Sequence, residues 1–141
     1  MQSTATARVS ASPAAVWAVL SDHEGMSKWG PGIRVRLEKE GSETRNGVGA
    51  VRRISSPGPM PAIVEEITAF EPDRVLGYKA LAGVPLKDYS GEVRLAPHGD
   101  GTEISYSISA HGKLPALDRI ATQAIASALL AALVRAVKKA S

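Results

Sequence analysis

Two charged residues that could form a binding or catalytic pair, Arg52 and Glu65, lie on predicted neighbouring strands. Side chains alternate between the two faces of a strand, so Arg52 shares a face with Ile54, and Glu65 shares a face with Ile67. A charge inside a protein is costly unless it is paired, and an ion pair between these residues would meet that requirement. The alternation also allows the opposite choice, in which either charged side chain points to solvent.

The three tyrosines follow the same alternation and fall on the face that carries aliphatic residues. The residues that share a face are Tyr78 with Leu76, Tyr89 with Val93, and Tyr106 with Ile108. An apolar cavity with a few polar groups is typical of a small-molecule site. We therefore predict such a cavity. The alternative is that the tyrosines are ordinary core residues with satisfied hydroxyl groups.

The sequence lacks the usual motifs of metal, nucleotide and nucleophile chemistry. Its histidines, His23, His98 and His111, stand at no metal-ligand spacing, and we expect them on the surface. The pattern from Gly47 to Gly49 has no third glycine and leads into a predicted strand, which excludes a dinucleotide-binding turn. We therefore predict no metal and no cofactor.

The elements that must position these residues are one strand, two short helices, six further strands and a long helix. The short helices begin at Pro13, after a serine cap, and near His23. The predicted strands cover residues 4–10, 33–38, 48–54, 63–70, 74–81, 87–96 and 102–110. Short connections between successive strands favour antiparallel neighbours, so we predict an α+β fold with one curved antiparallel sheet.

The last predicted element is a helix from Leu114 to Lys139, around which the sheet would wrap. Its apolar residues recur every three or four positions: Leu117, Ile120, Ala121, Ala124, Ile125, Ala128, Leu129 and Leu133. Residues 124–134 include no charged side chain, so we expect the helix to be mostly buried. The alanines along it would leave room for a cavity.

Composition and charge indicate a single soluble globular domain covering residues 1–141. The net charge is +3 and the sequence pI is about 9.4, but no stretch combines basic residues with stacking aromatics. We therefore expect no nucleic-acid partner. The sequence has no cysteine, which excludes disulfides and thiol chemistry, and we see no signal peptide. A cytoplasmic location is thus the default expectation.

The apolar runs of the sequence are short by the standard of a membrane span. The run that ends at Val134 is interrupted by Arg135 before it reaches the roughly 18–20 residues that a spanning helix needs. We therefore expect no stable membrane insertion. We expect the protein to be a monomer or a homodimer.

Several short segments, each weak alone, together resemble a known superfamily by their order and spacing. These segments are residues 10–17, Trp29, residues 47–52, Glu65 with Ile67, Tyr78, residues 88–91, residues 101–102 and the long helix. The chain resembles the START-like superfamily, also called SRPBCC or Bet v 1-like, over nearly its whole length. Within it, the chain is most similar to the polyketide cyclase/dehydratase-like proteins. The resemblance implies a helix-grip fold, in which seven antiparallel strands wrap around the C-terminal helix and leave a cavity.

The resemblance also implies which residues face that cavity. The predicted ligand-binding residues are Trp29, Ile33, Arg52, Ile54, Glu65, Ile67, Tyr78, Tyr89, Tyr106, Ile108, Ala121, Ile125 and Leu129. In the abscisic-acid receptor branch, a proline-containing loop after the third strand acts as a gate. Here the corresponding loop carries Pro57, Pro59 and Pro61, and the facing loop carries Pro85. The gate and latch motifs of those receptors are not reproduced, so a receptor function is unsupported.

Three functions are compatible with these features. We expect first a protein that binds a hydrophobic small molecule, such as a lipid, a polyketide or an isoprenoid. The alternative is a polyketide cyclase/dehydratase-type enzyme, with Glu65 as general base, Arg52 steadying an enolate oxygen and Tyr89 or Tyr106 donating a proton. The third is an interaction module that acts through the proline-rich loops, including a relative of the Hsp90-ATPase activators.

Overall fold

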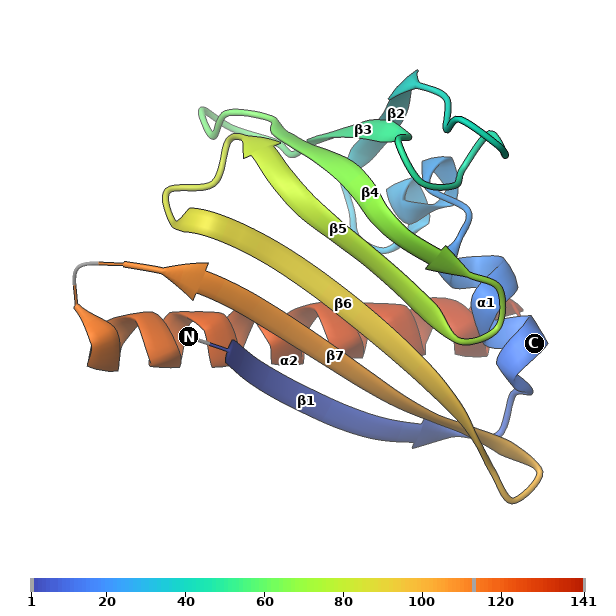
Figure 1. Ribbon diagram of the computed structural model, residues 1–141. Coiled ribbons are helices and arrows are strands. Elements are labelled where there is room, and N and C mark those ends of the chain that lie inside the picture. Colours follow the sequence, from blue (N-terminus) through green and yellow to red (C-terminus); the bar gives the residue numbers. More distant parts are fainter. Residues whose placement is uncertain (1, 113, 141) are drawn as a thin grey trace.

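Seven antiparallel strands form one curved sheet that lies over a long C-terminal helix (Figure 1). This computed structural model describes residues 2–112 and 114–140. The strands are β1 (Gln2–Val9), β2 (Arg34–Lys39), β3 (Val51–Ser55), β4 (Ile63–Glu71), β5 (Val75–Ala82), β6 (Lys87–His98) and β7 (Gly101–His111). The helices are α1 (Pro13–Leu20), the 3-10 helix η1 (Glu24–Lys28) and α2 (Pro115–Ala140). The predicted α+β helix-grip architecture, with two short helices after the first strand, is confirmed.

The order of the strands in the sheet is β1-β7-β6-β5-β4-β3-β2. From β2 to β7 each strand pairs with the next one along the chain, as the short connections predict. The exception is β1, which pairs with β7 and brings Ala5 opposite Tyr106. The first and last strands of the chain therefore lie side by side, and both contact α2.

The start of α1 follows from the predicted cap. The Ser12 hydroxyl accepts a hydrogen bond from the Ala15 backbone N–H at 3.2 Å, and Pro13 occupies the first turn. The helix buries Val16, Trp17 and Leu20, its predicted apolar stripe. This packing fixes the position of the segment that follows, including η1.

The third strand begins later than predicted, at Val51 instead of Val48. Gly49 has a φ of +92°, a conformation that glycine adopts readily, and the Ala50 N–H donates to the Gly47 carbonyl at 3.0 Å. A turn therefore precedes the strand. This turn ends the segment that covers His23, described below.

The long helix is less buried than predicted. Its buried residues are Thr122, Ala126, Leu130, Leu133 and Val137, whereas Leu117 and Ile120 are 60% and 67% exposed. The helix packs mainly on β1, β7 and α1, so only a narrow stripe is covered. Because the helix is apolar nearly all round, its periodicity did not identify which stripe that would be.

By length and composition alone, α2 could cross a membrane, with a mean hydropathy of 1.8 over its most apolar window. The sequence prediction had excluded a span because Arg135 interrupts the apolar run. The core helix of a soluble protein passes the same test, and the buried stripe of α2 lies against the sheet. The expectation of no stable membrane insertion stays a prediction.

Candidate functional site

A cavity of about 490 Å³ lies between the concave face of the sheet and α2. Its wall is contributed by every strand from β3 to β7, by the segment around η1 and by one face of α2. The lining residues are Met26, Trp29, Gly30, Ile33, Arg52, Ile54, Met60, Ile63, Glu65, Tyr78, Gly83, Val84, Pro85, Tyr89, Tyr106, Ile125, Ala128, Leu129, Ala132 and Arg135. Most of these are apolar, and the polar groups concentrate on β3 to β7.

Most of the predicted ligand-binding residues lie on this wall. They are Trp29, Ile33, Arg52, Ile54, Glu65, Tyr78, Tyr89, Tyr106, Ile125 and Leu129, and Pro85 of the predicted facing loop joins them. Ile67 and Ile108 do not, because both are completely buried in the packed core. Ala121 lies on α2 but outside the lining. The alternation placed these strand residues on the concave face of the sheet, but it does not indicate where along a strand the cavity ends.

The predicted gate loop contributes through a residue that the sequence did not single out. Met60 lines the cavity, whereas Pro57, Pro59 and Pro61 around it do not. The Pro57 ring lies against Gly32 in the turn before β2, where a β-carbon would have no room. The loop is thus in contact with the turn that holds Trp29 and Ile33 near the cavity.

Further lining residues were missed because their signals were weak. Met26 lies in the 3-10 helix η1, which is too short for a periodicity to assign a face, and Val84 lies in the loop between β5 and β6. Ala128 and Ala132 belong to the alanines that predicted room beside the helix, although Ala124 does not line the cavity. Arg135 could not be predicted as a cavity residue, because a charged side chain at the end of an apolar run normally points to solvent.

The polar part of the cavity wall, which we call the floor, consists of Arg52, Glu65, Tyr78, Tyr89 and Tyr106. Arg52 and Glu65 form an ion pair in it. The two residues are directly opposite each other on β3 and β4. Arg52 Nε donates to Glu65 Oε1 at 2.9 Å, and a terminal guanidinium nitrogen, Nη2, lies 2.7 Å from the same oxygen. The residues are only 2% and 4% exposed. Burial by itself lowers the pKa of Arg52, but the charge of Glu65, the nearby Tyr78 and Tyr106 and the hydrogen bond to Glu65 together outweigh it, so the pKa is raised and Arg52 stays charged.

His23 is the third member of this network, and the expectation that it lies on the surface was wrong. It is completely buried. Its Nε2 lies 2.8 Å from the Asn46 carbonyl oxygen, and its Nδ1 lies 3.2 Å from Arg52 Nη1. Since the carbonyl can only accept, Nε2 carries the proton and Nδ1 accepts from the guanidinium. A single histidine in a short helical segment gives no signal of such a contact, which only the fold creates.

The environment of His23 keeps its ring neutral. Burial lowers the pKa to about 4, and the positive charge of Arg52 lowers it as well. The hydrogen bond to the Asn46 carbonyl and the charge of Asp22 oppose this shift without cancelling it. A neutral imidazole can hold Arg52 in place without adding a charge beside it.

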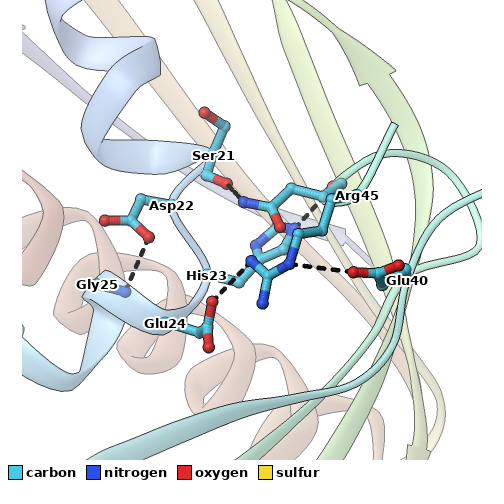
Figure 2. Close-up of polar contacts among 8 residues, drawn as sticks. Ser21, Asp22, His23, Glu24, Gly25, Glu40 and Arg45 are labelled. Atoms are coloured by element: carbon cyan, nitrogen blue, oxygen red, sulfur yellow. Dashed lines mark hydrogen bonds and ion pairs between the residues drawn. The ribbon is translucent and has the colours of Figure 1, made fainter. Parts of the chain in front are cut away.

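Residues close to His23 in the chain also make polar contacts with the connection between β2 and β3, residues 40–50 (Figure 2). Asn46 Nδ2 donates to the Ser21 carbonyl at 2.8 Å, on the side of the connection that also accepts from His23. Arg45 bridges Glu24 at 2.8 Å and Glu40 at 3.3 Å. These exposed ion pairs contribute little energy individually. Together with the Asn46 contacts they keep the connection over His23.

Three tyrosine side chains complete the polar floor. The hydroxyl groups of Tyr78 and Tyr106 are hydrogen-bonded at 2.8 Å, and the Arg52 guanidinium carbon lies 4.8 Å from the centre of the Tyr78 ring. Gly91 on β6 leaves the space that the Tyr78 ring occupies, because a β-carbon there would collide with that ring. Burial raises the pKa of Tyr78 and of Tyr89, and it raises the pKa of Tyr106 to about 12. All three hydroxyl groups are therefore protonated at neutral pH.

The arrangement offers hydrogen bonds inside an apolar enclosure. The floor has hydroxyl groups that both donate and accept, and the guanidinium supplies N–H donors. Within residues 2–112 and 114–140, no three His, Asp or Glu side chains are grouped so as to hold a metal ion. The floor thus offers hydrogen-bond donors and acceptors to a bound molecule, and Glu65 and Tyr89 are the groups that could exchange a proton, since Arg52 stays charged.

The architecture is the helix-grip fold of the Bet v 1-like and START proteins. The structure of a START superfamily protein from Mycobacterium smegmatis matches with a TM-score of 0.80 and 17% identity, covering 99% of both chains. Ara h 8.0201 matches with a TM-score of 0.75 and 17% identity, covering 99% of this chain and 98% of its own. A norcoclaurine synthase mutant from Thalictrum, in complex with a transition-state analogue, has a TM-score of 0.73, 20% identity and coverage of 99% and 94%. At these identities the likeness concerns the fold alone.

The sequence itself identifies the family. The family described as "Polyketide cyclase / dehydrase and lipid transport" matches residues 1–140. The chain belongs to this family. No curated protein matches it in sequence. Family and fold together indicate a domain that binds hydrophobic ligands.

Proposed function

We propose that this protein binds a hydrophobic small molecule, such as a lipid, a polyketide or an isoprenoid, in the cavity between the sheet and α2. The observation that carries the proposal is the cavity of about 490 Å³, whose mostly apolar wall ends in a small polar floor. Ligand sites in proteins have this combination, because apolar walls provide affinity and a few polar groups fix orientation.

The two loops at one end of the cavity support a path for the ligand. Met60 in the β3–β4 loop and Val84 and Pro85 in the β5–β6 loop belong to the lining. Met60 is 65% exposed, so it reaches both the cavity and the solvent. We infer that these loops, including Pro57, Pro59 and Pro61, move apart when the ligand enters.

A cytoplasmic location and a monomeric or homodimeric state remain predictions from the sequence.

Native mass spectrometry of the protein purified gently from its own host tests the proposal. We expect an extra small-molecule mass that is released on denaturation. Leu129→Trp should abolish it, because Leu129 lines the cavity and the larger side chain would fill that space. Ile120→Trp is the matched control, since Ile120 lies on the same helix but is 67% exposed and outside the lining.

The opposite result would be a ligand-free mass together with no change of melting temperature across a panel of lipids and polyketides. An extra mass that persists in Leu129→Trp would also count against the cavity as its site. The ligand-free result would turn attention to a protein partner at the proline-rich loops.

A cyclase or dehydratase function is the second candidate, because Arg52, Glu65 and Tyr89 all line the same cavity. In such an enzyme Glu65 would take a proton from a carbon between two carbonyls, and Arg52 would hold the enolate oxygen. The present geometry favours binding over this role, since Glu65 is held by Arg52 at 2.7 and 2.9 Å. Incubation with a poly-β-ketone thioester tests it. Turnover that is lost in Tyr89→Phe while binding persists would establish catalysis.

A further inference from the structure

The charges that line the cavity cancel at its floor. Among the described residues, the charged members of the lining are Arg52, Glu65 and Arg135. Arg52 and Glu65 are buried and satisfy each other. Arg135 belongs to the exposed part of α2, where water screens its charge. The floor therefore presents no net charge to a bound molecule.

The neighbours of the ion pair do not disturb this balance. His23, which contacts Arg52 from the side of η1, is a neutral imidazole at neutral pH because burial and Arg52 lower its pKa. The hydroxyl groups of Tyr78, Tyr89 and Tyr106 are protonated because burial raises their pKa values. These groups are polar and uncharged, and the tyrosine hydroxyls, which line the cavity, can bond to an oxygen atom of a ligand without requiring a counter-charge. Both ring nitrogens of His23 are already occupied by Asn46 and Arg52.

The guanidinium of Arg52 retains donors after its internal contacts are made. Its Nε and one terminal nitrogen contact Glu65, and its other terminal nitrogen contacts His23. A guanidinium has five N–H groups, so each terminal nitrogen keeps a second N–H. Together with the tyrosine hydroxyls, these donors suit a carbonyl or hydroxyl oxygen.

We propose that the ligand is uncharged where it meets the floor and places a carbonyl or hydroxyl oxygen there, as a ketone, phenol or alcohol does and a carboxylate does not. This inference rests on the proposed function. A carboxylate at the floor would lose its hydration, would be repelled by Glu65 and would find Arg52 already neutralised. Fatty acids held by their head group at this floor are thereby excluded.

The test uses two probes of nearly the same shape, acetylnaphthalene and naphthoate, substituted at the same ring position. They differ by a methyl group in place of a carboxylate oxygen. Any apolar cavity disfavours the carboxylate, so the wild-type preference alone does not test the ion pair. The decisive quantity is the change in the ratio of the two dissociation constants when one partner of the pair is removed, measured by isothermal titration calorimetry at neutral pH.

We expect the wild type to bind the ketone more tightly. In Glu65→Gln, Arg52 has no buried counter-charge, so the ratio should shift toward naphthoate by roughly tenfold or more. Arg119→Gln is the matched control and should leave the ratio unchanged, because Arg119 is exposed on the same helix and lies outside the lining of the cavity. If Glu65→Gln does not fold, as judged by circular dichroism, Arg52→Gln gives the mirror-image test. There an aminomethylnaphthalene cation should gain affinity relative to the ketone.

The outcomes separate the two proposals. Binding of the ketone with a ratio that does not change in Glu65→Gln, or in the mirror-image variant, overturns the inference and leaves the proposed function standing. Naphthoate binding as tightly as the ketone to the wild type also overturns it. Failure of both probes to bind the wild type contradicts the proposed function itself, and the inference with it.

Discussion

The two halves of the sheet relate differently to α2. On one side β1 and β7 pack directly on the helix, and residues such as Ile104, Ile108 and Leu133 are completely buried between them. On the other side β3 and β4 stand away from the helix (Figure 1), and the cavity occupies the space between. The packed half secures the helix, and the open half can therefore hold polar groups that a filled core would exclude.

The open half of the sheet, which contains β3 and β4, is held in place mainly by polar contacts. Its polar residues are held by one another and by the connection between β2 and β3, not by close packing against α2. Arg52 contacts Glu65, His23 and the Tyr78 ring, and each of these partners comes from a different element. The stability of this half should therefore depend on charge and protonation, and that of the packed half on volume.

The largest effect is expected when the buried ion pair is broken. Arg52→Met leaves the Glu65 carboxylate buried without a partner, which should lower the free energy of unfolding by about 3–5 kcal/mol. Removing both charges, as in Arg52→Met with Glu65→Leu, should recover most of this loss, because no unpaired charge remains. Urea denaturation of the two variants measures both values. A single variant as stable as the double one would show that water reaches Glu65 freely.

A pH-dependent effect of somewhat smaller size is expected from His23. Its folded pKa of about 4 lies below the ordinary value of 6.5, so the unfolded state binds more protons between these two values. The contribution is complete above about pH 6.5 and is lost as the pH falls toward 4, by about 3 kcal/mol in all. Urea denaturation at successive pH values should show this loss in the wild type.

His23→Gln should lack that part of the pH dependence, because glutamine does not titrate. His98→Gln is the control, since His98 is exposed, and it should retain the wild-type dependence. Parallel pH profiles for the wild type and His23→Gln would contradict the burial of a neutral imidazole beneath the open half.

The smallest loss of stability is expected at Leu129, which we compare with Leu133, one helical turn away on α2. Leu133 is completely buried in the packed half, and Leu133→Ala should cost about 2–5 kcal/mol through the cavity it leaves. Leu129 lines a cavity that already exists, so Leu129→Ala should cost only about 1 kcal/mol. The same substitution on the same helix cancels differences in helix propensity. Equal losses of unfolding free energy would mean that the open half is packed as tightly as the other.

Much of the fold was predictable because it depends on local patterns. Turn residues separated the strands, alternation indicated which residues of a strand share a face, and Ser12 with Pro13 marked the start of α1. The same alternation allowed Arg52 and Glu65 to share the concave face without requiring it, and the structure shows that they do and that they pair. The strand that begins at Val51 was predicted too long, because a glycine turn adjoined an apolar pair and resembled strand sequence.

The extent of the cavity could not be predicted in this way. Ile67 and Ile108 share a face with Glu65 and Tyr106, yet they lie in the packed core, because the distance between sheet and helix varies along each strand. Met60 and Val84 lie in loops, whose side-chain directions follow no period. Residues on regular elements were therefore predicted better than those in connections.

The sequence by itself determined the alternating strands, the caps and the long apolar helix, and it placed one arginine and one glutamate at positions on neighbouring strands where they could share a face. These depend on interactions between residues close in the chain or on the fixed geometry of a strand. The tertiary structure decided which stripe of α2 is buried, how far the sheet stands from it, and that His23 is sealed against Arg52. Those outcomes depend on contacts between segments that are distant in the chain. A helix that is apolar nearly all round could bury any of several faces, and a lone histidine could have any of several partners, until the chain is packed.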